Sequence, residues 1–162
     1  MSLIKTCTGQ YYNNDALERE FNYCVKKCEY WSGYGIRTDS IESAIFDMRR
    51  VKILSQKEDG KQLYHMVISI RRPNDNNNDK STENASCYLI GSEVSIILFN
   101  YGYQNAFFKH NDNGNIHLHF IINSVNFRTK KKLSGVHGIN NEIFSYIKGQ
   151  YPFLKWEGPY YV

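Results

Sequence analysis

The hydrophobic positions in the first half of the chain change from a helical period to a strand period. From residue 15 to about residue 29, apolar residues recur at the three- and four-residue spacing of an amphipathic helix. Over residues 62–71 they alternate instead, with Tyr64 on one face and His65 on the other. The Asn-rich residues 73–79 that follow predict an exposed loop.

The second half of the chain predicts a helix, a hairpin and a further helix. An apolar stripe at helical spacing follows Ser81 or Thr82, either of which could cap the helix. Two strand-like runs, residues 103–110 and 115–123, flank an Asn-Gly pair, which is the strongest short hairpin signal. A last helix near residues 140–148 ends before a proline. This order of elements predicts an α+β fold, with a largely antiparallel sheet and helices packed on one face.

The second strand of the hairpin separates its histidines from its apolar side chains. His117 and His119 share one face, and a two-residue loop at 113–114 would place His110 directly opposite His117. Residues two apart on a strand are about 6.6 Å apart, and cross-strand partners have Cβ atoms about 5 Å apart. Three imidazoles therefore converge and could bind one metal ion. Asp112, on the same face, could accept a histidine N–H or bind the metal through water.

Two plainer explanations apply to these residues. A His-x-His strand alone is more often an exposed polar sheet face, and it is the third histidine at the partnered position that favours a metal site. His65 shares a strand face with Ser69 and is better explained as a hydrogen-bonded structural histidine. Imidazole ligands suit Zn, Ni, Cu or Mn better than Mg, so these ligand types do not identify which metal binds.

Composition narrows the class of protein. A chain of 162 residues with 41% hydrophobic residues is the size of one domain, and the net charge of +4 permits nucleic acid as a partner. Aromatic residues make up 15% of the chain, including 13 Tyr, and stacking on unpaired bases is one use for them. There is no signal-peptide-like start and no membrane-spanning run, so we expect the four cysteines to be reduced in the cytoplasm.

The hairpin motif resembles that of mobilisation relaxases of the HUH endonuclease class. In that family a His-x-Asp precedes a His-hydrophobic-His pair and an Asn follows, as residues 110–126 do here, and residues 64–69 resemble an earlier core strand. The resemblance covers about residues 10–135. It implies a ferredoxin-like HUH core, here one nuclease domain over residues 1–162, in a bacterial cytoplasm.

The same resemblance implies an activity and its partners. The enzyme would nick single-stranded DNA at the transfer origin of a plasmid or conjugative element, with accessory mobilisation proteins as further partners. The metal would be Mg or Mn, with Zn or Ni as alternatives. The expected DNA contacts are basic residues near the helix end and after the hairpin: Lys26, Lys27, Arg128, Lys130, Lys131 and Lys132. Any of these clusters could instead be ordinary solvated charge.

The resemblance also implies a nucleophilic tyrosine on a helix before the histidine motif, and Tyr23 occupies that place. Independently, Tyr23 lies off the apolar stripe of its helix. Its phenol would attack a phosphodiester and stay joined to the 5′ phosphate, while the metal neutralises charge on the phosphate. We therefore expect Tyr23 and Asp112 to be catalytic. An exposed tyrosine without a function is the alternative.

Two rival functions use other features. Tyr151 and Lys155 form a Tyr-x-x-x-Lys after the histidine motif, the order found in rolling-circle replication initiators and HUH tyrosine transposases. Pro152 makes that segment a poor helix, which favours Tyr23. The other rival is a non-catalytic module that binds single-stranded nucleic acid through aromatic and basic side chains.

Overall fold

The computed structural model describes residues 1–71, 80–112 and 114–162, and of residues 80–84 it describes only the helical backbone. The Asn-rich segment at residues 73–79, Asn113 and the side chains of Ser81 and Thr82 lie outside this description. In chain order the elements are β1 (Ser2–Cys7), α1 (Ala16–Val25), β2 (Cys28–Tyr34), α2 (Ile41–Leu54), β3 (Leu63–Ile70), α3 (Lys80–Asn100), β4 (Asn105–Asp112), β5 (Asn115–Asn123), α4 (His137–Gln150), the 3-10 helix η1 (Pro152–Leu154) and β6 (Trp156–Tyr161).

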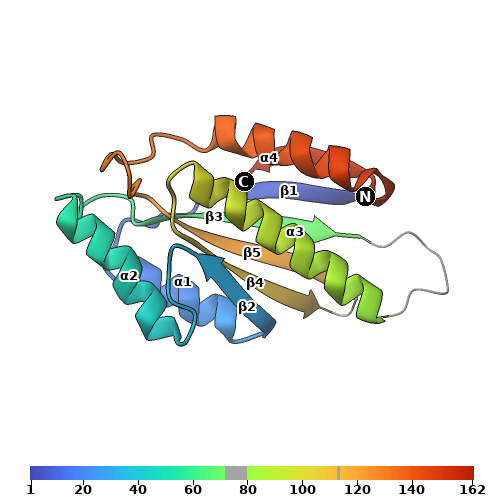
Figure 1. Cartoon of the computed structure of the whole chain (residues 1–162), viewed down its shortest axis with the longest axis horizontal. Helices are drawn as coiled ribbons and strands as arrows, with labels where there is room; N and C mark the ends of the chain where they lie inside the picture. The colour runs from blue at the N-terminus through green and yellow to red at the C-terminus, as the bar shows by residue number, and fades with distance from the viewer. Residues whose placement is uncertain (72–79, 113) are drawn as a thin grey trace.

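The strands form one sheet in the order β2-β4-β5-β3-β1-β6 (Figure 1). All neighbouring strands are antiparallel except β1 and β6, which run parallel. The expected α+β fold with a largely antiparallel sheet is therefore confirmed. The hairpin register is confirmed as well, because His110 pairs with His117 and Asp112 pairs with Asn115.

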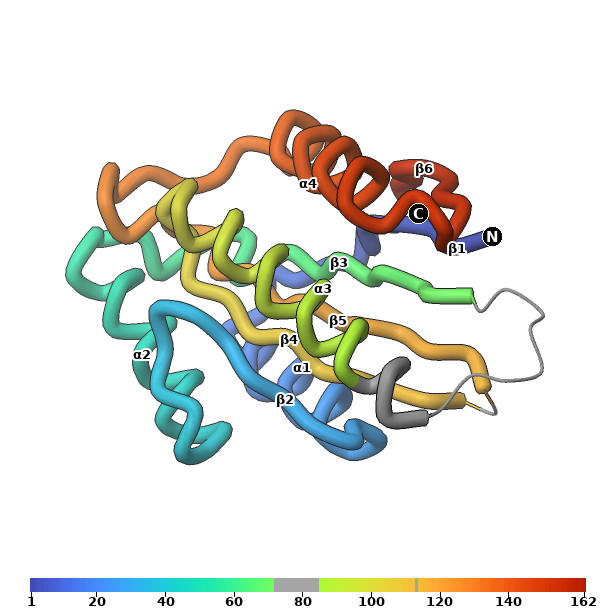
Figure 2. Tube along the Cα trace, turned by 45° about the vertical axis from the view of Figure 1, so that its right-hand side comes forward, coloured from blue at the N-terminus to red at the C-terminus, as the bar shows by residue number. Residues whose placement is uncertain are grey.

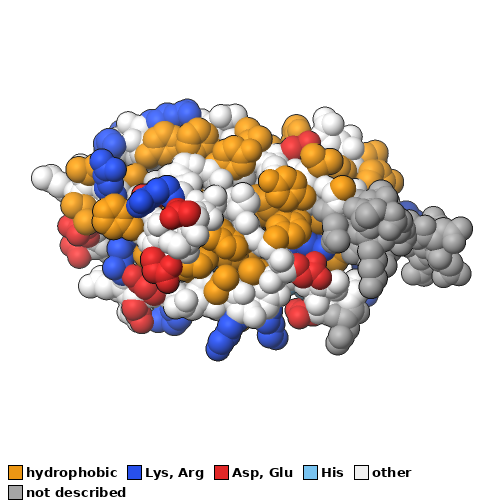
Figure 3. All heavy atoms as spheres, turned by 60° about the horizontal axis from the view of Figure 1, so that its bottom comes forward, with side chains coloured by type: hydrophobic (Ala, Val, Ile, Leu, Met, Phe, Trp, Pro, Cys, Tyr) orange, Lys and Arg blue, Asp and Glu red, His pale blue; other side chains and the backbone are white. Residues whose placement is uncertain are grey.

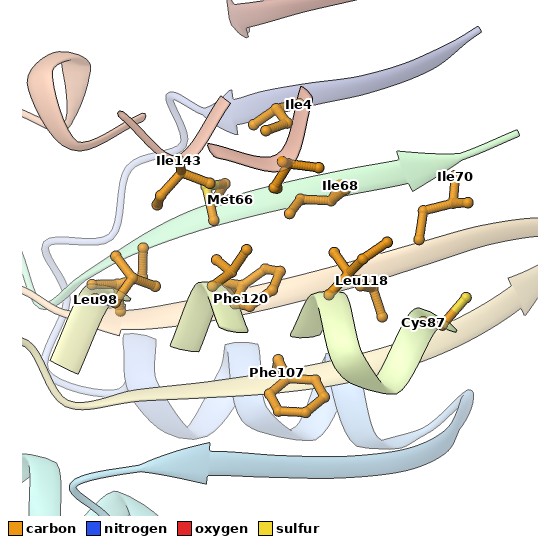
Figure 4. Packing of buried hydrophobic residues seen from close by; sticks show 14 of the residues in the cluster. Ile4, Met66, Ile68, Ile70, Cys87, Leu98, Phe107, Leu118, Phe120 and Ile143 are labelled. Atoms are coloured by element: carbon orange, nitrogen blue, oxygen red, sulfur yellow. The ribbon is translucent and has the colours of Figure 1, made fainter. Parts of the chain in front are cut away.

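One face of the sheet packs against α3 and α4. The alternation along the strands sends Met66, Phe107, Leu118 and Phe120 to this face, where all four are buried (Figure 4). The apolar stripe of α3 covers them. Although α3 is 21 residues long, no helix in the described part of the chain is both long and apolar enough to cross a membrane.

The opposite face of the sheet packs against α1 and α2, which corrects the expectation that helices lie on one face only. Figures 1 and 2 show α3 in front of the sheet and α1 behind it. Phe108 lies at the centre of the hydrophobic core on this face. Its ring contacts Phe21 of α1 edge-on, with the centroids 5.6 Å apart, and stacks on Trp31 of β2 at 5.8 Å. The central strands present apolar side chains on both faces, so both must be covered.

The sequence pattern did not predict β2, α2 or β6. Every residue of β2 is at least partly exposed, so no buried and exposed positions alternate along it. In α2 the buried positions are Ala44, Ile45, Met48 and Lys52, a short stripe that a charged residue interrupts. Gly158 and Pro159, both unfavourable for strands, lie within β6.

Helix α1 fixes the position of Tyr23. Its buried residues Leu17, Phe21 and Cys24 face the second core, and Tyr23, between the last two, is 56% exposed. This agrees with the expectation that Tyr23 lies off the apolar stripe. The packing of Phe21 and Cys24 therefore sets where the phenol can reach.

Replacing Phe21 with Ala should lower the free energy of unfolding by about 3–5 kcal/mol, because the ring is fully buried between α1 and Phe108. Urea denaturation followed by circular dichroism measures the change. The matched control is Phe46→Ala on α2, whose side chain is 58% exposed; it should change the value by less than about 1 kcal/mol. Equal stability of the two variants would contradict a core role for α1.

Candidate functional site

A pocket of about 280 Å³ opens on the second face of the sheet, between the C-terminal part of α1 and strands β1, β3, β4 and β5. Its lining includes the predicted histidines, the predicted nucleophile and several residues that the sequence pattern did not single out. The lining residues are Lys5, Cys7, Tyr23, Lys27, His65, Val67, His110, Asp112, His117 and His119.

Strand register explains why these side chains meet. Across the sheet, Ser69 of β3 pairs with His117 of β5, and His117 pairs with His110 of β4. One row along, Lys5 pairs with Val67 and Val67 with His119. Paired residues point to the same face of a sheet, so these two adjacent rows place the three histidines and Lys5 on the pocket face. The pairing of β4 with β5 therefore brings three histidines to one pocket.

Each of the three predicted metal ligands has one ring nitrogen already occupied by a protein partner. Nε2 of His110 lies 2.5 Å from the carbonyl oxygen of Cys24. Nδ1 of His117 lies 3.4 Å from the Ser69 hydroxyl, and Nδ1 of His119 lies 2.9 Å from Nε2 of His65. A neutral imidazole that donates through one nitrogen keeps a lone pair on the other. Each histidine can therefore offer one nitrogen to a cation.

Burial holds His65, His117 and His119 in the neutral form that binds metals. It lowers the pKa of His119 to about 3, with neighbouring histidines and Lys5 adding to the effect. Burial also lowers the pKa of His65 to about 4. For His117 burial lowers the pKa, and it outweighs the opposing effect of the Asp112 carboxylate. At neutral pH no proton then has to be displaced from these three rings before a metal binds.

A second set of donor atoms shares His65 and His119 with the pocket lining and adds the buried Cys24. Ligand atoms of Cys24, His65 and His119 all lie within 4.8 Å of one another. The Cys24 side chain is fully buried, and burial raises the pKa of its thiol. His119 thus belongs both to the predicted trio and to this second set, while His65 takes part in the site more directly than the sequence suggested.

Tyr23 lies at the rim of the pocket beside the histidines. The centroid of its ring is 6.2 Å from that of His119 and 6.5 Å from that of His110. Partial burial raises the pKa of the phenol, and negative charge on neighbouring groups, including Glu20 and Asp112, raises it further. The phenol is therefore protonated at neutral pH, and any attack by its oxygen requires a proton acceptor.

The structure brings only some of the predicted DNA contacts to this pocket. Lys27 lines it, and Lys26 precedes Lys27 at the end of α1. Residues 128–132 follow the far end of β5 instead, at the opposite end of the sheet from the hairpin (Figures 1 and 2). There Arg128 donates to the carbonyl of Asn100, while Lys132 donates to the carbonyls of Asp59 and Lys61.

Basic side chains do not form one continuous track on the face that Figure 3 shows. Outside the grey residues, Lys and Arg lie there in separate groups among hydrophobic and acidic side chains, and no histidine is visible (Figure 3).

Tyr151, the rival nucleophile, lies on the other side of the sheet. It packs against the core under α3 and α4, and its hydroxyl donates to a carboxylate oxygen of Glu93 at 2.8 Å. Burial and this carboxylate raise the pKa of the phenol. The histidine pocket opens on the opposite face, so the structure does not bring Tyr151 to it.

Four residues at the site escaped the sequence analysis. Lys5 and Cys7 come from β1, where every second residue points to the pocket face, and Glu20 and Cys24 come from α1. Burial alternates along Ser2–Cys7, but apolar and polar residue types do not, so the sequence gives no clear signal for this strand. Its position next to β3 depends on the sheet order, which local pattern does not encode.

Comparisons with known proteins agree on one family. The model of the family "Relaxase: MobA/VirD2-like, nuclease domain" matches residues 12–145. Two curated proteins of Staphylococcus aureus, both named Protein rlx, are 31% identical over 120 residues, or 74% of this chain. The match covers 35% of one and 34% of the other, so the chain corresponds to about a third of their length.

A solved structure has the same fold. It comes from work on the molecular basis of vancomycin resistance transfer in Staphylococcus aureus and aligns with a TM-score of 0.55 over 99% of this chain and 97% of the other. Sequence identity is 10%, so this similarity concerns the fold alone.

In the metal-free protein, the free energy of unfolding should fall as the pH decreases from about 6.5 toward about 4. In the folded chain burial lowers the pKa of His65 to about 4 and that of His119 to about 3, whereas an unfolded histidine has its ordinary pKa of about 6.5. The unfolded chain therefore binds more protons in this window, and the stability present above it is lost. Urea denaturation at a series of pH values, with a chelator present, measures the dependence.

The variant His65→Asn should show a shallower dependence on pH, because one of the two groups is gone. Phe46→Ala, remote from the pocket, should retain the wild-type dependence. If His65→Asn and wild type lost stability in parallel, the neutral buried state of His65 would be refuted.

Proposed function

The chain belongs to the MobA/VirD2-like relaxase family, whose nuclease domain it matches, and we propose that it nicks single-stranded DNA through attack by Tyr23. The membership confirms the family that the histidine motif predicted. The choice of nucleophile, the metal ligands and the DNA site are the proposal. One observation carries it: Tyr23 lies next to three histidines that each keep one ring nitrogen for a cation.

The residues present fit a divalent cation. His110, His117 and His119 would hold it, since they are mostly buried, have fixed hydrogen bonds, and line one pocket with an acidic residue. When bound, the cation would neutralise charge on the scissile phosphate and orient it for in-line attack. The relaxase resemblance favours Mg or Mn, while three imidazole donors also suit Zn or Ni.

Tyr23 would exchange one phosphodiester for another. Its hydroxyl oxygen forms a bond to phosphorus, the bond from phosphorus to the 3′ oxygen breaks, and the 5′ phosphate remains esterified to the tyrosine. The phenol proton leaves to solvent or a pocket carboxylate, and the departing 3′ oxygen takes up a proton to become a free hydroxyl. No cofactor is consumed, so the reverse reaction can rejoin the strand.

Other charged residues in the pocket have supporting roles in this proposal. The charge of Asp112 acts on both Tyr23 and His117, and its carboxylate would hold a histidine N–H or a water at the cation. Lys5 and Lys27 line the same pocket, so their ammonium groups would contact phosphates on either side of the cleaved bond. The phosphates would add negative charge where the pocket already carries cations.

The biological setting extends the same proposal. The DNA would be the transfer origin of a plasmid or conjugative element, reached in a bacterial cytoplasm with accessory mobilisation proteins. Residues 1–162 would act as one nuclease domain. A non-catalytic module that binds single-stranded nucleic acid remains the outcome to expect if no cleavage occurs.

Tyr23→Phe should bind DNA and metal like wild type but form no covalent adduct. The change removes the attacking oxygen and leaves the ring, so strand cleavage should fall by roughly 10³-fold or more. Cleavage of single-stranded origin DNA is followed on denaturing gels, and mass spectrometry maps the adduct.

Tyr151→Phe is the matched control, because it removes the same atom from the other face of the sheet. It should cleave at the wild-type rate. An adduct that persists in Tyr23→Phe and disappears in Tyr151→Phe would replace the relaxase mechanism with that of a replication initiator or transposase.

Salt dependence should separate the two groups of basic residues. With an oligonucleotide of a few nucleotides around the nick site, Lys27→Ala should reduce the slope of log affinity against log salt by about 0.7, the value for one lost phosphate contact on a single strand. The double variant Lys130→Ala, Lys131→Ala should leave that slope unchanged, since residues 128–132 follow the far end of β5. The reverse pattern would mean that the strand does not cross the histidine pocket.

A further inference from the structure

His65 connects the histidine pocket to an acidic residue of α1. Its Nε2 lies 2.9 Å from Nδ1 of His119. Its Nδ1 lies 3.4 Å from a carboxylate oxygen of Glu20 and 3.3 Å from the hydroxyl of Tyr11. The His65 side chain is buried and that of Glu20 is largely so. A chain of contacts therefore runs from α1 through β3 to β5.

The chemistry of the rings fixes the direction of these hydrogen bonds once His119 binds a cation. For Nε2 of His119 to keep a free lone pair, the ring proton must be on Nδ1, which then donates to Nε2 of His65. His65 must in turn carry its proton on Nδ1, which points at Glu20 and Tyr11. An ionised carboxylate can only accept, so Glu20 stabilises this arrangement.

The opposite arrangement would block metal binding. If Nε2 of His65 donated to His119, the proton of His119 would have to be on the nitrogen that faces the pocket. That nitrogen would then have no lone pair to offer. The tautomer of His65 therefore decides whether His119 can act as a ligand.

We propose that His65 is a positioning residue, oriented by Glu20, that fixes the ring and tautomer of His119 for cation binding. The inference rests on the proposed metal site and gives a role to His65 and Glu20, which are not among its three ligands. Carboxylates and carbonyls that accept from the far nitrogen of a metal-bound histidine commonly set ligand basicity and orientation. Here a second histidine extends that connection to a carboxylate on the nucleophile's own helix.

The alternative hypothesis for the same residues is that His65 binds the metal directly, together with Cys24. A nitrogen that binds a cation has neither a proton to donate nor a lone pair left to accept with, so two ligand nitrogens cannot also share a hydrogen bond. The nitrogens of His65 and His119 are 2.9 Å apart and joined as donor and acceptor, and burial raises the pKa of the Cys24 thiol. Both features favour positioning over ligation.

The test measures Mn²⁺ affinity by calorimetry, without DNA or turnover. His65→Leu should weaken binding about 10- to 100-fold, and Glu20→Gln should weaken it by a smaller factor. His65→Gln should recover part of the loss, because an amide oxygen can accept the same hydrogen bond from His119. The partial recovery is the result that a purely structural role would not give. Circular dichroism checks that each variant folds; should His65→Leu not fold, the comparison of His65→Gln and Glu20→Gln with wild type decides.

Cys24→Ser is the matched control for the rival site. It should bind Mn²⁺ within about threefold of wild type, and Co²⁺ bound to wild type should show no thiolate-to-cobalt charge-transfer band. A large loss in Cys24→Ser or a clear charge-transfer band would overturn positioning in favour of ligation. Wild-type affinity in both His65→Gln and Glu20→Gln would overturn it as well.

The metal site and the positioning role fail in different ways. If wild type binds no Mn²⁺, or if His117→Ala binds it normally, the proposed metal site is wrong. If His117→Ala abolishes binding while the His65 and Glu20 variants bind normally, the metal site stands and the positioning role alone is refuted.

Discussion

Antiparallel pairing of His110 with His117 is the constraint on which the site depends. The opposite faces of the same strands hold Phe107, Leu118 and Phe120, all buried against α3. A slip of one residue would turn these side chains to the pocket and the histidines into the apolar core, which costs several kcal/mol for the large rings alone. The hydrophobic core on one face therefore maintains the convergence of imidazoles on the other.

Covering the second face with α1 does two things for the chemistry. The buried side of the helix anchors it to the sheet, and the exposed Tyr23 is held at the pocket rim. The same covering removes water from His65 and His119, which lowers their pKa values and keeps them neutral. Placement of the nucleophile and preparation of the ligands thus have one physical cause, the packing of α1.

The elements that the sequence predicted well are those with a strong period or a distinctive turn. The alternation around His65, the β4–β5 hairpin and the stripe of α3 match the structure, whereas the first helix, expected to reach about residue 29, ends at Val25, and Cys28 already belongs to β2. Tyr23 lies beside the histidines. β2, α2 and β6 lack such signals. Local sequence patterns do not predict contacts between elements. The link from Glu20 through His65 to His119 depends on how α1 lies across the sheet. The separation of residues 128–132 from the pocket depends on strand order.

The central claim is that one cation binds where the three histidines of β4 and β5 meet, beside Tyr23. Anomalous diffraction at the manganese edge, from crystals grown with Mn²⁺, would locate the ion directly. The account predicts one strong peak within bonding distance of nitrogens from His110, His117 and His119, on the pocket side of the rings. A peak held by Cys24 and His65 instead, or no peak near these histidines, would contradict it.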